Sequence, residues 1–278
     1  MPATPSWPPQ STPRLFVDHD VAPGPLRIDG PQAHYLVSVM RMKTGDPVKL
    51  FDGTTGEWLG IASTVGRRDL LLEVTEKLRE REAVPDLWLC AAPLKKGRID
   101  WMVEKACELG VGRIVPVVTR RAVVDKPKHD RLRAHMIEAA EQCGRTAIPD
   151  LAETVKLPAL LRDWPEGRTL FFADEAGGVP AFEAMRAGGA TAAILIGPEG
   201  GFDDEERATI KAHPQTVGIS LGPRILRADT AAAAAISVWM AAHGDWQAAT
   251  SAPPCPSLHG GNDDKDRFKE QLADHRVA

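Results

Sequence analysis

The spacing of apolar residues changes along the chain and divides it into two regions. Up to about residue 79 the apolar runs are short and separated by glycine and polar residues, which is typical of strands joined by tight turns. Strands are predicted over residues 14–17, 48–51, 58–62 and 70–74, with one helix over residues 34–40. The second and third of these strands flank a glycine-containing turn and are expected to form a hairpin. This region is predicted to be a small β-barrel.

From residue 87 onward, apolar strands alternate with amphipathic helices. Strands are predicted over residues 87–92, 114–118, 170–173, 192–196 and 217–221, and helices near residues 99–109, 131–143, 203–212 and 230–243. Gly110 is expected to end the first of these helices. Regular alternation of strand and helix is the pattern of a parallel sheet covered on both faces, so we predict an α/β domain.

The chain of 278 residues is long enough for about two domains. We place the barrel at residues 14–80 and the α/β domain at residues 86–246, with a charged linker over residues 76–85. Residues 1–13 and 247–278 are rich in proline, glycine or charge and are expected to be flexible tails.

Composition is ordinary for a globular protein, with 43% hydrophobic and 26% charged residues. The net charge of −4 gives no sign of a nucleic-acid partner. The charge is uneven, however: residues 94–146 carry 12 basic against 7 acidic residues, whereas the remainder of the chain to the C-terminus is acidic. The basic segment is either a pair of solvated helix faces or a surface that faces phosphates.

The four cysteines include no Cys-x-x-Cys pair, so neither a disulfide framework nor a metal site is expected. Residues 1–13 lack the features of a secretory signal. The most apolar stretch, residues 231–242, is shorter than the ~20 residues that a membrane span needs. We therefore expect a soluble, cytoplasmic protein.

Ligands of open parallel sheets bind at the carboxyl ends of the strands, and three loops follow such ends here. The first loop, residues 172–178, has the composition of an ordinary turn when it is considered by itself. The second, residues 196–202, packs three glycines around Glu199 but fits neither nucleotide-binding glycine motif. Four carboxylates at residues 203–206 open the next helix, so its amino end should repel a pyrophosphate and accept a neutral or cationic ligand.

The third loop, residues 221–230, places Arg224 and Arg227 around the apolar pair Ile225-Leu226. Apolar residues at a strand end suggest a wall for a flat aromatic group. Asp229 or Thr230 is expected to cap the following helix. The five alanines that follow permit close packing of the helix backbone.

Five motifs in these regions resemble one known family. They are His34 through Val39-Met-Arg-Met42 with Gly45-Asp46, Glu104-Lys-Ala-Cys-Glu-Leu-Gly110, Glu138-Ala-Ala-Glu-Gln-Cys-Gly-Arg145, Leu195-Ile-Gly-Pro-Glu-Gly-Gly201 and Leu221-Gly-Pro-Arg-Ile-Leu-Arg227. Together they resemble the RsmE family of the SPOUT class, which methylates N3 of a uridine in 16S ribosomal RNA. The resemblance implies a PUA-like RNA-binding barrel, a parallel-sheet methyltransferase domain with a trefoil knot, and a homodimer acting on ribosomal RNA, most naturally in the assembled 30S subunit.

The resemblance also implies the site. S-adenosylmethionine would be held by Leu195, Gly197, Glu199, Gly200, Gly201, Leu221, Gly222, Ile225, Leu226 and Thr230. Asp229 is the candidate base for the uridine N3 proton, and Arg227 would stabilise negative charge on the neighbouring carbonyl oxygen. The family usually has Thr-Glu-Thr where this chain has Ala228-Asp229-Thr230, which leaves both the base and the helix-cap roles of Asp229 open. Cys143 is expected to be a packed core thiol.

Seven cations are candidates for contact with RNA phosphates: Arg14, Arg41, Lys95, Arg98, Arg120, Arg121 and Arg145. Each is equally well explained as solvated or salt-bridged. Two other functions stay open, a SPOUT methyltransferase for another RNA position and a non-catalytic RNA-binding factor of ribosome assembly. A nicotinamide dehydrogenase is disfavoured because the dinucleotide fingerprint is missing.

Overall fold

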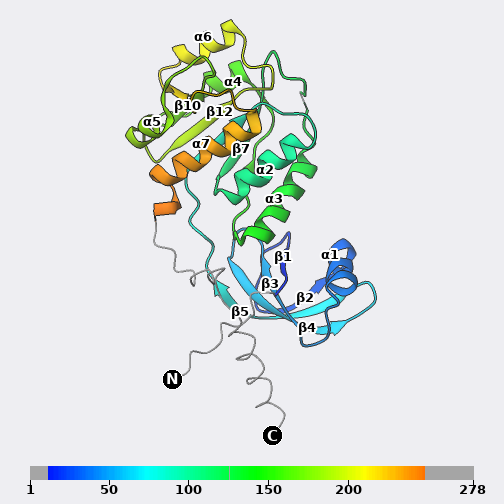
Figure 1. Cartoon of the computed structure of the whole chain (residues 1–278). Coiled ribbons are helices and arrows are strands. Elements are labelled where there is room, and N and C mark those ends of the chain that lie inside the picture. The colour runs from blue at the N-terminus through cyan, green and yellow to red at the C-terminus, as the bar shows by residue number, and fades with distance from the viewer. Residues whose placement is uncertain (1–11, 125, 248–278) are drawn as a thin grey trace, which may run out of the picture. The chain divides into compact units, whose positions relative to one another are not determined.

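The computed structural model describes residues 12–124 and 126–247 (Figure 1). Almost all of the two expected tails lies outside the described residues, as does Cys255. The described residues belong to one compact unit. This unit contains two separate β-sheets, which the first strand-rich region and the following alternating region build in turn.

The first sheet has the strand order β1-β3-β4-β5-β2. Its strands are β1 (Arg14–Phe16), β2 (Gly24–Ile28), β3 (Pro47–Phe51), β4 (Glu57–Val65) and β5 (Leu70–Arg79). The four predicted strands and the β3–β4 hairpin are confirmed. Strand β2 was not predicted because glycine and proline occupy its first two positions.

The structure differs from the predicted elements of this region in two places. Strand β5 continues to Arg79, so the expected linker begins too early at residue 76. The end of β5 lies against Gly56, where a Cβ atom would be only 2.4 Å from the carbonyl oxygen of Arg79. The predicted helix over residues 34–40 is instead a short α-helix, α1 (Gly30–His34), that continues into a π-helix, η1 (Tyr35–Val39).

The second sheet has the order β11-β13-β10-β12-β6-β7-β8, and its paired strands are parallel. Its strands are β6 (Leu87–Ala91), β7 (Arg113–Val118), β8 (Asp150–Leu151), β10 (Thr169–Ala173), β11 (Val179–Pro180), β12 (Ala192–Ile196) and β13 (Thr216–Ser220), and β9 (Val155–Lys156) pairs with β7. All five predicted strands are present. The three additional strands have two residues each, too few for a periodic pattern.

Helices cover both faces of this sheet (Figure 1). They are α2 (Arg98–Glu108), α3 (His129–Cys143), α4 (Leu157–Arg162), α5 (Ala181–Ala187), α6 (Asp204–Ala212), α7 (Ala228–His243) and the 3-10 helix η2 (Asp245–Gln247). The four predicted helices are confirmed, and Gly110, with φ of +96°, follows the end of α2 as expected. Helices α4 and α5 are too short to show an apolar stripe.

Alternate residues of each strand serve the two faces. Leu89 and Ile194 pack in the core with α2, α3, α5 and α7, whereas Cys90 and Leu195 pack in the core with α4 and α6. The amino-terminal half of α7 buries small alanines, and the helix as a whole packs against α2 and α5. The sheet is therefore the middle layer of three, as the sequence predicts.

A buried ion-pair network joins the first sheet to α3. Glu57 forms ion pairs with two arginines: Oε1 lies 2.5 Å from the Arg14 Nε, and Oε2 lies 2.9 Å from the Arg79 Nε. Arg14 also donates to the carbonyl oxygens of Ala140 and Arg145. Burial acts to raise the pKa of Glu57, but the hydrogen bonds and charges of Arg79 and Arg14 outweigh it and hold that pKa below its ordinary value.

We predict that Glu57→Gln lowers the melting midpoint at pH 7 by about 5 °C, because two guanidinium groups lose their buried counter-ion. The depressed pKa means that the carboxylate stabilises the fold above its ordinary pKa and ceases to do so as the pH falls through the lowered value. The difference between variant and wild type should therefore shrink below pH 4.5. Calorimetric scans from pH 3 to pH 8 test this, with the exposed Glu73→Gln as control. Equal midpoints at pH 7 would contradict it.

Candidate functional site

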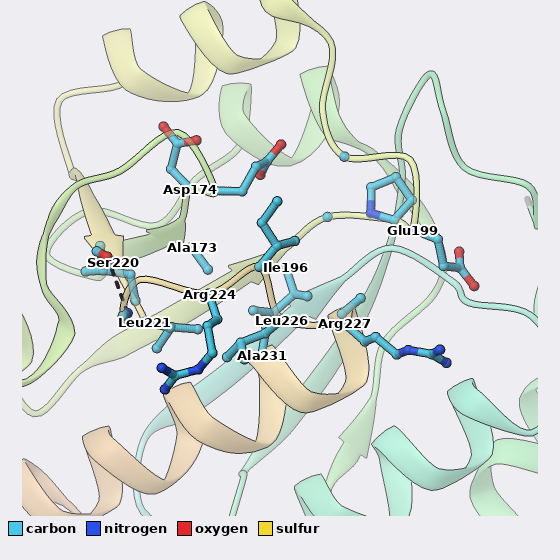
Figure 2. A pocket seen from close by; sticks show the side chains of 18 of the residues that line it. Ala173, Asp174, Ile196, Glu199, Ser220, Leu221, Arg224, Leu226, Arg227 and Ala231 are labelled. Atoms are coloured by element: carbon cyan, nitrogen blue, oxygen red, sulfur yellow. Dashed lines mark hydrogen bonds between the residues drawn. The ribbon is translucent and has the colours of Figure 1, made fainter.

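A cavity of about 490 Å³ opens at the carboxyl ends of β10, β12 and β13. All three loops singled out in the sequence line it, together with Arg98 and Ala231. Figure 2 shows the side chains of Ile196, Leu226 and Ala231 gathered in the middle of this cavity, and those of Glu199 and Arg227 extending to one side. The three loops come together because their strands are parallel neighbours.

The loop after β12 needs its glycines for close contacts. Gly201 has φ of +66°, and a Cβ atom there would lie 2.7 Å from the Glu175 Oε1. A Cβ on Gly197 would lie 2.7 Å from the ring of Phe202, which is buried. The backbone of this loop can therefore follow the floor of the cavity without side chains filling it.

The loop after β10 is held by a buried carboxylate. Asp174 is fully buried and pairs with Arg207 and, at 2.7 Å, with the Lys211 Nζ, both on α6. Glu175 forms an ion pair with Arg207, with 2.6 Å between Oε1 and the guanidinium Nη2. This loop does contain a turn, since the Gly177 N–H donates to the Asp174 carbonyl oxygen, but it also forms one wall of the cavity. Arg207 therefore fixes the two acidic residues of that wall.

The loop after β13 presents apolar side chains and free backbone donors. Ile225, which stands between Arg224 and Arg227 in the sequence, is 87% exposed. The backbone N–H groups of Arg224, Ile225 and Leu226 donate to no acceptor within the described part of the chain. Apolar surface beside unused N–H groups is the combination that a flat heteroaromatic ligand requires.

The predicted capping of α7 is wrong. The helix begins at Ala228 with Arg227 at the cap position, and no side chain caps it. Asp229 lies inside the first turn, where its carboxylate accepts the N–H of Thr230 at 2.9 Å. The cap role is thus removed from both residues.

The carboxylates expected at the amino end of α6 are present there. Asp203 and Glu206 cap the helix reciprocally, and Arg120 pairs with Asp203 and Glu205. The Glu206 N–H holds the pKa of Asp203 below its ordinary value, and Arg120 does the same for Glu205. These carboxylates are therefore ionised at neutral pH and oppose a phosphate.

Most residues expected to hold a cofactor line the cavity: Gly197, Glu199, Gly200, Gly201, Leu221, Gly222, Ile225 and Leu226, with Arg227 beside them. Leu195 does not, because it faces the opposite core, and its neighbour Ile196 lines the cavity instead. Exposed Thr230 lies outside the lining, whereas Ala228 and Ala231 belong to it. Sequence reasoning missed the role of Asp174 and placed Arg98 among the RNA cations but not in the cavity, and strand alternation was enough to choose Ile196 over Leu195.

Two of the seven candidate RNA cations are corrected by the structure. Arg14 is engaged in the buried network around Glu57. Arg145 is 6% exposed and donates to Glu82 and to the carbonyl oxygens of Cys107 and Val111. Both guanidinium groups are used inside the protein and are not available to phosphates.

The other five cations are at least partly accessible. Arg98 lines the cavity, and Arg121 donates to the Gly200 carbonyl oxygen at 3.1 Å. The Lys95 side chain is exposed, and its backbone N–H donates to Glu199. Arg120 is exposed but paired with carboxylates, as described above. Arg41 is exposed and follows the helical segment that joins β2 to β3.

The described cysteines do not lie in the cavity. Burial raises the pKa of Cys90 and of Cys107 to about 12, so both are inert thiols. Cys143 is exposed, contrary to the expected core position. Within residues 12–124 and 126–247, no three His, Cys, Asp or Glu side chains are grouped to hold a metal ion. No helix in that part of the chain has the length and apolar character to cross a membrane.

Family models match both parts of the chain. An RNA methyltransferase domain matches residues 80–240, and an RNA methyltransferase PUA domain matches residues 28–75. Together with the parallel sheet and its cavity, these matches define an RNA methyltransferase of the α/β class with a PUA domain.

Relatives identify the particular family. Ribosomal RNA small subunit methyltransferase E of Rickettsia conorii is 30% identical over 208 residues, which are 73% of this chain and 84% of the relative. The Bacillus subtilis protein of the same name is 30% identical over 224 residues, 76% of this chain and 87% of the relative. The chain belongs to the ribosomal RNA small subunit methyltransferase E family, the RsmE family that its motifs resemble.

Solved structures agree. A methyltransferase from Legionella pneumophila in complex with S-adenosylmethionine superposes with a TM-score of 0.75 at 30% identity, covering 83% of this chain and 98% of that one. The Neisseria gonorrhoeae member of the family, bound to the same cofactor, gives a TM-score of 0.76 at 23% identity, covering 82% of this chain and 97% of that one, and supports the fold.

We predict that Arg207→Met lowers the free energy of unfolding by about 3 kcal/mol, because Asp174 would stay buried with only Lys211 as counter-ion. Urea unfolding followed by tryptophan fluorescence measures this. The matched control is Arg186→Met, an exposed arginine on α5, which should change the value by less than about 0.5 kcal/mol. The prediction fails if both variants unfold alike.

Proposed function

We propose that the protein transfers the methyl group of S-adenosylmethionine to N3 of a specific uridine in 16S ribosomal RNA. The observation that carries the proposal is the cavity at the strand ends, built from the loops that carry the family motifs, in a chain that belongs to the RsmE family. The action on 16S RNA comes from the named activity of the relatives.

The cavity fits the cofactor in size and chemistry. Its volume lies within the ~300–1,000 Å³ usual for small-molecule sites. S-adenosylmethionine carries a cation and no phosphate. Of the lining carboxylates, Asp174 and Glu175 are paired with α6, and Glu199 forms no ion pair with a described residue, so its charge is available to the cation. The free N–H groups of Ile225 and Leu226 can donate to ring nitrogens of an adenine. When bound, the cofactor supplies an electrophilic methyl group.

The residues proposed to hold it are those expected from the sequence, with two changes. Gly197, Glu199, Gly200 and Gly201 form one side, and Leu221, Gly222, Ile225 and Leu226 form the other. Ile196 and Ala231 replace Leu195 and Thr230. Ala231 matters because a larger side chain on α7 would project into the space beside Leu226 (Figure 2).

The chain must also remove a proton, because N3 of uridine carries one and becomes nucleophilic only as it leaves. We propose Asp229 as the base. Asp229 is not part of the cavity lining, but it lies between the lining residues Ala228 and Ala231, and its carboxylate accepts a single hydrogen bond within the described residues, which leaves lone pairs available. Arg227 would stabilise the negative charge that develops on the adjacent carbonyl oxygen.

The target base must leave its stack to reach the cavity, so RNA phosphates have to be held around the opening. We propose Lys95, Arg98, Arg120 and Arg121 for this task, with Arg41 acting from the barrel. Arg120 would exchange its partners Asp203 and Glu205 for phosphate. Arg14 and Arg145 are removed from the set.

We further propose two domains, residues 14–80 and 86–246, a trefoil knot in the second, and a cytoplasmic homodimer acting on the 30S subunit. The two separate sheets and the ranges of the two family models support the division. The non-sequential strand order supports the knot. Trp101, 40% exposed on α2, supports an apolar contact between subunits.

Methyl-labelled S-adenosylmethionine tests the function directly. Incubated with the protein and 30S subunits lacking the modification, it should label one uridine at N3, mapped by nuclease digestion and mass spectrometry. Free 16S RNA and 50S subunits are the comparison substrates. Labelling at another position would indicate the alternative function, a SPOUT methyltransferase that acts elsewhere on RNA. Tight binding of the cofactor in calorimetry without any methyl transfer would overturn the proposal.

For the base, we predict that Asp229→Asn lowers the single-turnover rate at saturating cofactor by at least about 100-fold, since positioned general bases contribute that much or more. The loss should diminish as the pH rises, because N3 of uridine then ionises without help. Cofactor affinity should be unchanged, and Thr230→Val serves as the neighbouring control. A near-normal rate in Asp229→Asn would exclude the base role.

A further inference from the structure

A fourth loop reaches the edge of the sheet where the cavity opens. It joins β6 to α2 over residues 92–97, and β6 is the parallel neighbour of β12, so the carboxyl ends of both strands share this edge. The Ala92 N–H donates to the Ile196 carbonyl oxygen at 3.0 Å, and Leu94 is buried in the core. The loop is therefore anchored directly beside the glycine loop that follows β12.

The backbone of this fourth loop holds the Glu199 carboxylate. The Lys95 N–H donates to the Glu199 Oε1 at 3.3 Å, which is the one hydrogen bond that this carboxylate accepts within residues 12–124 and 126–247. Glu199 is exposed, so packing does not fix its side chain, and ordering it costs conformational entropy. The place of the Glu199 carboxylate at the edge of the cavity therefore depends on where the Lys95 backbone lies (Figure 2).

Asp100, in the first turn of α2, fixes that stretch of backbone. Gly97 has φ of +90°, a conformation that favours glycine, and its N–H donates to the Asp100 Oδ2 at 2.9 Å. The Arg98 N–H donates to the Lys95 carbonyl oxygen at 3.1 Å, which closes the turn over residues 95–98. Arg98 also lines the cavity. The Asp100 side chain thus holds a turn that contacts the cavity through both of its ends.

The Asp100 carboxylate is itself held by the neighbouring helix. Asp100 is only 6% exposed and forms an ion pair with Arg131 of α3, and its Oδ1 lies 3.6 Å from the His135 Nε2. The His135 Nδ1 lies 2.9 Å from the Glu104 Oε1, so the histidine bridges two carboxylates of α2. Burying a carboxylate costs free energy unless it is paired, and removing its partner leaves that cost uncompensated. Helix α3 therefore fixes Asp100, and Asp100 fixes the turn.

We infer that Asp100 is a positioning residue of the cofactor site. Held by Arg131, it fixes the turn of residues 95–98, and through the Lys95 N–H it keeps the Glu199 carboxylate at the edge of the cavity. Asp100 does not line the cavity and acts only through these residues. The inference rests on the proposed function, because it names a residue that sets the geometry of the site proposed for S-adenosylmethionine.

Calorimetric titration with S-adenosylmethionine, well below every melting midpoint, tests the inference. We expect Asp100→Ala to weaken binding about 10-fold, as the loss of a hydrogen bond to a charged group does. Asp100→Asn keeps an oxygen that accepts the Gly97 N–H and should weaken binding less than about 3-fold. Glu57→Gln removes a buried carboxylate outside the cavity lining, so it controls for general destabilisation and should bind the cofactor like wild type.

A double-mutant cycle separates positioning from a general loss of structure. If Asp100 acts through Glu199, the variant carrying both Asp100→Ala and Glu199→Gln should bind the cofactor as weakly as Glu199→Gln alone, to within about 2-fold. Two losses that multiply would overturn the inference. In the protein without cofactor, hydrogen exchange over residues 95–98 should become faster in Asp100→Ala but not in Asp100→Asn or Glu57→Gln.

The wild-type protein distinguishes failure of the inference from failure of the function. If wild type binds S-adenosylmethionine and Asp100→Ala binds it equally well, the inference is overturned and the proposed function stands. Wild type that binds no S-adenosylmethionine overturns the proposed function and the inference with it. If Asp100→Ala does not fold, Arg131→Met, which releases the same carboxylate from α3, takes its place with the same expected outcomes.

Discussion

Parallel pairing of β10 with both β12 and β13 is the constraint on which the site depends. Because the three strands run the same way, the loops that leave them meet at one edge of the sheet, although they are separated by up to about fifty residues of chain. The close approach of these loops then restricts their residues. Gly201 must lack a side chain because Glu175 occupies the space, and Glu175 is there because Arg207 on α6 holds it beside the buried Asp174.

The same arrangement sets the electrostatic character of the cavity. Its fixed charges on one side are carboxylates, and the helix that begins at its edge is capped by Asp203 and Glu206 rather than left open for an anion. On the other side, the loop after β13 contributes apolar side chains and unused N–H groups. A cationic, phosphate-free ligand with a flat ring is compatible with both sides, which is why the fold and the cavity chemistry agree with the family.

Much of this architecture is predictable from sequence because it is local. Apolar runs and their alternation with amphipathic stretches identify all five central strands and four helices, and the position of the loops after strand ends identifies all three cavity loops. The failures share a cause, which is that they depend on partners distant in the chain. From the sequence, Arg14 and Arg145 are predicted to be surface cations, but in the structure they pair with Glu57 and Glu82. From the sequence, Asp174 is predicted to be a turn residue, but in the structure it is buried and pairs with Arg207.

Counting charges along the chain misleads for the same reason. The segment 94–146 has an excess of basic residues, yet Arg145 is buried, and Arg120, Arg131 and Arg133 are paired with Asp203, Asp100 and Asp18. The barrel segment is nearly neutral, yet two of its carboxylates are used within the protein. Asp52 accepts N–H groups of its own turn, and Glu57 is buried at the junction with α3. Within the described residues, Arg41, Lys43, Arg67 and Arg68 form no ion pair, and neither does the exposed Asp29 at the start of α1. Affinity for a polyanion depends on cations without partners, so a chain of net charge −4 can present a basic surface where its composition suggests none.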